Sequence, residues 1–200
     1  MTPAESARQR LAAGGAPVAV HPLGFACAQI QPGLCVHCWL PGEPELEPVL
    51  ETSPVHCHRW NLSSRVLAGE VGNTVWTAYP TGRLYASHRV YDIRVTPDAD
   101  VIRPTGRYVR ATPGIPTFAE VGDTYTLPAG VFHASIIAGL AVTLLTAVRE
   151  PGVRDRALGS LIPPATRVTR RRDASPALAA RVTRLALRHL ESYQAARGVR

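Results

Sequence analysis

The chain has 200 residues, enough for one domain with a substantial core, and this length does not favour two independent domains. It carries 22 basic residues, all of them arginine, against 15 acidic ones, a formal net charge of +7. It has no apolar run of about 18 residues and no basic start followed by a long apolar stretch, so neither a membrane span nor a secretory signal is predicted. Four cysteines are too few for a disulfide scaffold, and we expect reduced thiols in a cytoplasmic protein.

The predicted elements begin with a weak helix at residues 4–13 and continue as short strands. Strand-like segments rich in Val, Thr, Tyr and Trp are separated by Gly, Pro and Asp turns, and an acidic, Pro-rich loop follows the first of them. The predicted strands are 34–40, 54–69, 73–80, 83–95, 107–113, 123–130, 132–139 and 140–148. Eight short strands at this spacing predict an all-β sandwich or barrel. We expect residues 1–32 to be an N-terminal extension, 33–150 the barrel, and 151–200 a linker with a C-terminal helix.

The whole excess of positive charge lies in the C-terminal tail. Residues 167–200 hold nine arginines against two acids, a balance of +7, whereas residues 1–166 hold thirteen of each. The run at 167–172 is predicted to be an exposed linker. Ser175 as N-cap, Pro176 at the first helical position and Gly198 as the stop predict an amphipathic helix with a basic face. We expect it to pack on the body or on a partner subunit; charge-driven contact with nucleic acid or an anionic membrane is the less favoured alternative.

Two histidines, His56 and His58, stand one residue apart in a predicted strand. Because alternate side chains of a strand share a face, both are expected to point the same way, with Cys57 pointing to the other side. Two imidazoles placed in this way can converge on one metal ion.

A second motif follows about 75 residues later. Gly122, Pro128, Gly130 and His133 match the pattern G-x5-P-x-G-x2-H, and the histidine pair with Gly69 keeps the spacings of H-x-H-x3-E-x6-G. These are the two halves of the cupin signature, in the right order. From about residue 33 to residue 148 the chain resembles a cupin, which implies a double-stranded β-helix, or jelly-roll barrel, with a metal held by His56, His58 and His133.

The chain departs from the cupin pattern at Leu62, where many cupins carry a metal-binding Glu, and at Ile137, where the second motif often ends in Asn. The remaining neutral three-histidine face resembles that of the thiol dioxygenases, in which Fe(II) binds a thiol and O₂ and the sulfur is oxidised to a sulfinate. A metal with three neutral ligands keeps its full charge and so attracts an anionic thiolate or carboxylate. The resemblance implies Fe(II), with Ni, Zn, Cu or Mn as alternatives.

Several further residues are weaker candidates. Tyr125, Arg65 and Ser64 are candidate catalytic or pocket-lining residues; alternation places Ser64 on the ligand side and Arg65 outward. A carboxylate substrate would need an arginine in the pocket. His37 is expected to be structural or close to the site. Cys35 and Cys38 have the spacing of half a zinc knuckle, but no second pair follows, so buried structural thiols are favoured.

Three functions remain open. The first is an Fe(II) dioxygenase acting on a small thiol or other anionic metabolite, with O₂ as co-substrate. The second is a non-redox metal enzyme, namely an isomerase, decarboxylase or hydrolase. The third is a non-catalytic ligand-binding cupin with a basic interaction tail. The tail helix offers a face for a homodimer, which cupins commonly form.

Overall fold

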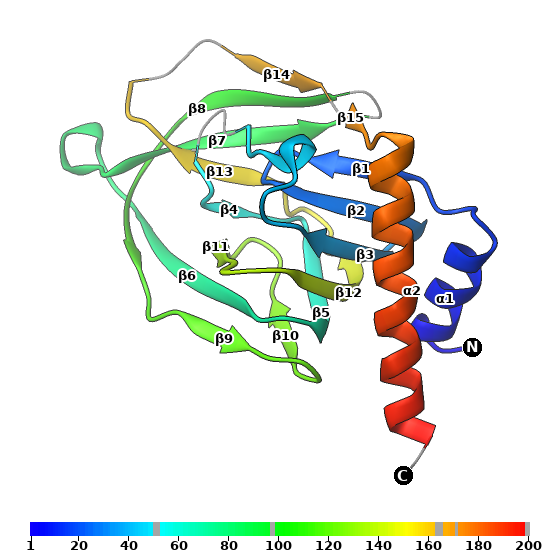
Figure 1. Cartoon of the computed structure of the whole chain (residues 1–200). Helices are drawn as coiled ribbons and strands as arrows, with labels where there is room; N and C mark the ends of the chain where they lie inside the picture. Colours follow the sequence, from blue (N-terminus) through cyan, green and yellow to red (C-terminus); the bar gives the residue numbers. More distant parts are fainter. Residues whose placement is uncertain (50–52, 97–98, 163–165, 171, 199–200) are drawn as a thin grey trace.

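The computed structural model describes residues 1–49, 53–96, 99–162, 166–170 and 172–198. The described chain is mostly β, with one helix near each end (Figure 1). One antiparallel sheet has seven strands in the order β10-β5-β12-β3-β2-β1-β15. These strands are β1 (Val18–His21), β2 (Phe25–Gln31), β3 (Leu34–Trp39), β5 (Trp60–Ala68), β10 (Thr124–Leu127), β12 (Ala141–Arg149) and β15 (Arg172–Asp173).

The second set of strands pairs in the order β14-β8-β7-β13-β4-β11-β6-β9. Because the long strand β8 also pairs with β6, six of them close into an antiparallel barrel. The strands of this set are β4 (His56–Cys57), β6 (Val71–Pro80), β7 (His88–Val95), β8 (Ala99–Pro113), β9 (Thr117–Ala119), β11 (Phe132–Ile136), β13 (Arg156–Gly159) and β14 (Arg167–Arg170). Two 3₁₀ turns, η1 (Pro44–Leu46) and η2 (Arg83–Tyr85), lie in connections. The prediction of a β-rich barrel with a C-terminal helix is confirmed.

Both helices lie on one face of the seven-stranded sheet (Figure 1). Helix α1 (Pro3–Ala12) begins with a capping box between Thr2 and Glu5, and helix α2 (Pro176–Gly198) has the Ser175 hydroxyl as acceptor for the Leu178 amide at 3.2 Å. Apolar side chains of the two helices and of strands β1, β2, β3, β5 and β12 form one buried cluster. The expected packing of the tail helix on the body is therefore observed.

Strict alternation along β3 separates this core from the opposite face of the sheet. Leu34, Val36 and Cys38 belong to the cluster under the helices, whereas the residues between them face the interior between the two sheets. The helices thus bury the aliphatic face of β3, and the face that carries Cys35 and His37 lines a cavity. This placement brings the polar side chains of β3 to the side of the candidate site.

The run at 167–172 differs from the predicted linker. Residues Arg167–Arg170 form β14 against β8, and Arg172–Asp173 form β15 against β1, while Arg171 lies outside the described residues. Arg167, Arg170 and Arg172 are exposed, as expected, whereas Thr169 is half-buried. The run adds an edge strand to each set of strands, because β8 and β1 each have an edge to which it can pair. The sheets also extend beyond the predicted 33–150 barrel, since β1 and β2 precede it and β13 follows it.

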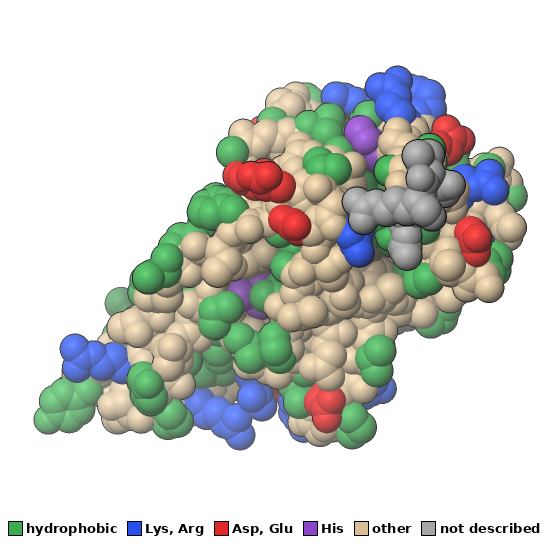
Figure 2. Space-filling model, turned by 90° about the horizontal axis from the view of Figure 1, so that it is seen from below, with side chains coloured by type: hydrophobic (Ala, Val, Ile, Leu, Met, Phe, Trp, Pro, Cys, Tyr) green, Lys and Arg blue, Asp and Glu red, His purple; other side chains and the backbone are tan. Residues whose placement is uncertain are grey.

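Exposed apolar side chains are a feature of the side formed by β6, β8 and β9. Figure 2 shows apolar side chains scattered over the face seen from below, with arginines mostly near its margins. The large exposed ones on this side include Tyr79, Ile115 and Phe118. Within the described residues, no helix is both long and apolar enough to cross a membrane.

Candidate metal centre

Strand pairing brings the two histidine motifs together. His56 in β4 and His133 in β11 are directly opposed partners on adjacent antiparallel strands. Side chains at such positions share a face and lie about 5 Å apart at their β-carbons. His58 follows β4 by one residue, where the chain leaves the barrel for β5 in the other sheet. The cluster therefore sits where one segment crosses between the two sheets.

The backbone at this crossing is held from two sides. The Gly130 amide donates to the His58 carbonyl at 2.8 Å, so the glycine of the second motif fixes the histidine of the first. The Arg59 amide donates to the Asp155 carboxylate at 2.7 Å, and the Arg59 guanidinium forms an ion pair with the same carboxylate at 3.5 Å. Asp155 is buried, with 8% of its surface exposed. Sequence reasoning missed this residue because no motif marks it.

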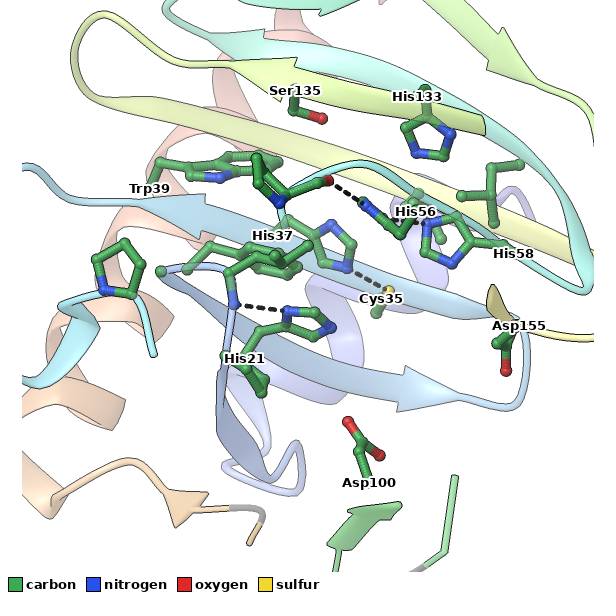
Figure 3. A pocket seen from close by; sticks show the side chains of 18 of the residues that line it. His21, Cys35, His37, Trp39, His56, His58, Asp100, His133, Ser135 and Asp155 are labelled. Atoms are coloured by element: carbon green, nitrogen blue, oxygen red, sulfur yellow. Dashed lines mark hydrogen bonds between the residues drawn. The ribbon is translucent and has the colours of Figure 1, made fainter. Parts of the chain in front are cut away.

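The three imidazoles converge (Figure 3). The Nε2 atoms of His56 and His58 are 3.1 Å apart, and one donor nitrogen from each of the three rings lies within 4.8 Å of the others. Two ligands at right angles on a metal with bonds of about 2.0–2.1 Å would be about 3 Å apart. Without a metal, the short contact is a hydrogen bond in which one nitrogen carries a proton. A metal ion can replace that proton, so the donor set fits a metal with imidazole ligands.

Backbone carbonyls orient two of the rings. His56 Nδ1 lies 2.8 Å from the Pro54 carbonyl and His133 Nδ1 lies 3.0 Å from the Val131 carbonyl. A carbonyl only accepts, so in both rings Nδ1 carries the proton and, in the neutral ring, Nε2 keeps its lone pair. Such outer partners are typical of metal-binding histidines, because they fix both the ring and its tautomer.

The surroundings favour neutral imidazoles. Burial lowers the pKa of His56, and the Pro54 carbonyl and Asp155 partly oppose this effect. Burial, with the neighbouring histidines, holds the pKa of His58 well below its ordinary value. Burial and His56 lower the pKa of His133 to about 4. At neutral pH all three rings are therefore neutral and able to bind a metal.

A cavity of about 860 Å³ opens beside the cluster. Its wall is largely apolar, and Leu62, at the position where many cupins carry the acid, is part of it. Arg59 is the one arginine among its lining residues in the described chain, and it is already paired with Asp155. A cavity of this size accommodates a small organic molecule.

The structure places the three weaker candidates differently. Tyr125 lines the cavity, and burial raises the pKa of its hydroxyl. Ser64 is its cross-strand partner on β5 and is fully buried, but it is not part of the cavity wall. Arg65 points outward, as alternation predicted: its guanidinium donates to the Gly122 carbonyl and lies 5.5 Å from the ring centre of Tyr193 on α2. None of these contacts tests a catalytic role.

A second group of donor atoms lines the same region. Cys27 on β2 and Cys35 and His37 on β3 have their ligand atoms within 4.8 Å of one another. Cys35 and Cys38, which have the spacing of half a zinc knuckle, are both buried free thiols, and they point to opposite faces because they lie three positions apart in a strand. Cys27, on the preceding strand, is the direct cross-strand partner of His37 and so shares its face with Cys35; only the register of β2 on β3 reveals this grouping.

No protein-family model matches this chain, and no curated protein does so either.

Proposed function

We propose that His56, His58 and His133 hold a transition-metal ion in a barrel of the cupin double-stranded β-helix type, and that the protein is an Fe(II)-dependent dioxygenase of a small thiol. One observation carries the proposal: three neutral imidazoles from two motifs converge beside a cavity of about 860 Å³. The carbonyl partners of His56 and His133 support it further.

Within the described residues no acid joins the three-histidine cluster, and this favours a thiol substrate. Leu62 lines the cavity where a carboxylate would otherwise lower the charge of the metal, so the ion would keep its full +2 charge. Such an ion attracts a thiolate more strongly than one with a carboxylate ligand. Iron bound there would supply the redox chemistry with O₂ that protein side chains alone do not provide. Ni, Zn, Cu or Mn at the same ligands would suit the non-redox alternatives.

The cavity wall argues against a carboxylate as the main recognition feature of the substrate. Arg59 is neutralised by Asp155 and Glu43 by Arg181, and Glu47 and Asp100 also line the cavity. A carboxylate-bearing substrate would meet more acids than bases there. We therefore favour a neutral or amine-bearing thiol over one with a free carboxylate.

The chain itself would orient and shield the reactants. The Gly130 and Asp155 hydrogen bonds keep the backbone around His58 in place, and the apolar part of the wall, with Trp39 and Leu62, would limit the contact of bound reactants with water. Because burial raises its pKa, the hydroxyl of Tyr125 stays protonated at neutral pH and would serve as a hydrogen-bond donor to a bound substrate. Catalytic roles for Tyr125, Ser64 and Arg65 stay predictions.

The test is O₂ uptake by protein purified without oxygen and loaded with Fe(II). We expect uptake with 2-aminoethanethiol that exceeds uptake with cysteine, and formation of the corresponding sulfinate. His133→Asn and His56→Asn should abolish it, since Asn keeps a donor near the position of Nδ1 but removes Nε2. His88→Asn is the matched control, because His88 lies outside the cavity wall and bonds to Ser87.

Four outcomes would count against the proposal. Uptake that does not depend on iron, or no uptake with any thiol, would reject the dioxygenase. Metal binding without uptake would point to a non-redox metal enzyme, whereas no metal binding at all would favour a ligand-binding protein.

A further inference from the structure

Three soft or borderline donors meet on the inner face of β2 and β3, apart from the three-histidine cluster. Cys27 is the direct cross-strand partner of His37, and Cys35 lies two positions before His37 on the same strand. All three side chains therefore share one face of the sheet. The Sγ atom of Cys35 is 3.3 Å from Nε2 of His37 (Figure 3).

Cys35 and His37 face away from the core that their neighbours on β2 and β3 form, and Cys27 packs against the cluster that contains Phe25 and Trp39. Ala26 and Ala28 on β2, like Val36 and Cys38 on β3, pack in the core beneath the helices. Cys35 and His37 instead line the large cavity. Of the four thiols, Cys38 packs within the apolar core, and the Sγ atom of Cys57 lies 3.9 Å from the Arg154 carbonyl oxygen. Only Cys27 and Cys35 group with a histidine among the described residues.

The spacing of the donor atoms suits a tetrahedral metal ion. Zinc bonds of about 2.3 Å to sulfur and about 2.0–2.1 Å to nitrogen place two ligand atoms about 3.5–3.8 Å apart. The three donors lie within 4.8 Å of one another, with one pair at 3.3 Å, so small side-chain rotations suffice. Two cysteines and one histidine form a ligand set that zinc sites use when a fourth position is left open.

We propose that Cys27, Cys35 and His37 form a second metal site, selective for Zn²⁺ over hard cations, whose fourth position faces the cavity. On binding, both thiols release their protons to solvent and coordinate as thiolates. The site shares no residue with the three-histidine cluster. It would place a Lewis-acidic ion in the same cavity, where an anionic or thiol group of a ligand can occupy the fourth position.

Anaerobic titration of the metal-free protein with Co²⁺, a spectroscopic substitute for Zn²⁺, tests the site. Thiolate ligation gives an intense sulfur-to-cobalt charge-transfer absorption that imidazole ligation alone does not produce. We expect this absorption in the wild type and its loss on addition of Zn²⁺. It should also disappear in Cys35→Ala and Cys27→Ala. Cys38→Ala, the matched thiol control, should retain it.

His133→Asn separates this proposal from the proposed function, because it should lose O₂ uptake and keep the charge-transfer absorption. The wild-type spectrum decides whether a thiolate binds at all, so the test does not depend on a variant that fails to fold. Circular dichroism establishes that each variant is folded. The second site is rejected if the wild type shows no charge-transfer absorption, or if that absorption persists in folded Cys35→Ala and Cys27→Ala.

Discussion

His133 is the most buried member of the three-histidine cluster, with 2% of its surface exposed. Its burial has a cost in free energy, because protonation inside the protein leaves a charge that water no longer solvates. In the unfolded chain the same ring has an ordinary pKa of about 6.5. The ring is therefore well suited to bind a metal at neutral pH and poorly suited to carry a proton.

This difference predicts a pH dependence of stability for the metal-free protein. The pKa of His133 is about 4 in the folded state, below its unfolded value, so the unfolded chain binds more protons between the two values. The stabilisation is complete above about pH 6.5 and is lost as the pH falls towards 4, by about 3 kcal/mol for this residue. Urea unfolding in a chelating buffer at pH 7 and at pH 4 measures the change.

His133→Asn is the control for that measurement, because carboxylates also titrate over part of the range. The variant should show a smaller loss of unfolding free energy between the two pH values than the wild type. An identical loss in both proteins would mean that His133 takes up no proton on unfolding, and so that its pKa is not lowered in the folded state.

At the scale of elements, the turn between β5 and β6 carries a glycine of the first motif. Gly69 has a φ of +70°, and a β-carbon there would collide with the Leu140 carbonyl. Gly69→Ala should therefore lower the unfolding free energy by more than about 1–2 kcal/mol, the cost of a left-handed conformation alone. Denaturant unfolding measures it.

Gly139→Ala provides the matched substitution, because a β-carbon at Gly139 meets nothing within 4 Å and its φ is not positive. It should change stability by less than about 1 kcal/mol. Equal losses of unfolding free energy in the two variants would show that the positive φ and the close contact at Gly69 are not the reason for a glycine there.

Much of this element-level structure could be predicted from the sequence. The His56 and His58 pair and His133 stand in motifs with fixed spacing, and the Ser175 cap with its apolar repeat marks α2. The role of Asp155 and the grouping of Cys27 with Cys35 and His37 could not be predicted. Both depend on contacts between strands, and the local pattern of polar and apolar residues does not determine which residues of two strands are paired.

At the scale of the whole molecule, the basic tail is part of the body. Leu178, Val182, Ala186 and Leu190 of α2 are buried against α1 and the sheet. At the start of α2 the Ser175 amide and hydroxyl both donate to the Glu45 carboxylate, and Arg181 forms an ion pair with Glu43 at 2.7 Å. The predicted homodimer and cytoplasmic location stay predictions.

The closed barrel and its cavity belong to this scale as well. The sequence predicts many short strands, but closure depends on β8 being long enough to pair with both β7 and β6. The cavity then forms between the barrel and the seven-stranded sheet, because the helices cover only the outer face of that sheet.

Metal content tests the central claim most directly. Wild-type protein and His133→Asn are purified without oxygen, saturated with Fe(II), freed of unbound metal and compared by elemental analysis. The account predicts one equivalent of metal fewer per chain in the folded variant, with His88→Asn indistinguishable from wild type. Equal metal content in the wild type and folded His133→Asn would contradict it.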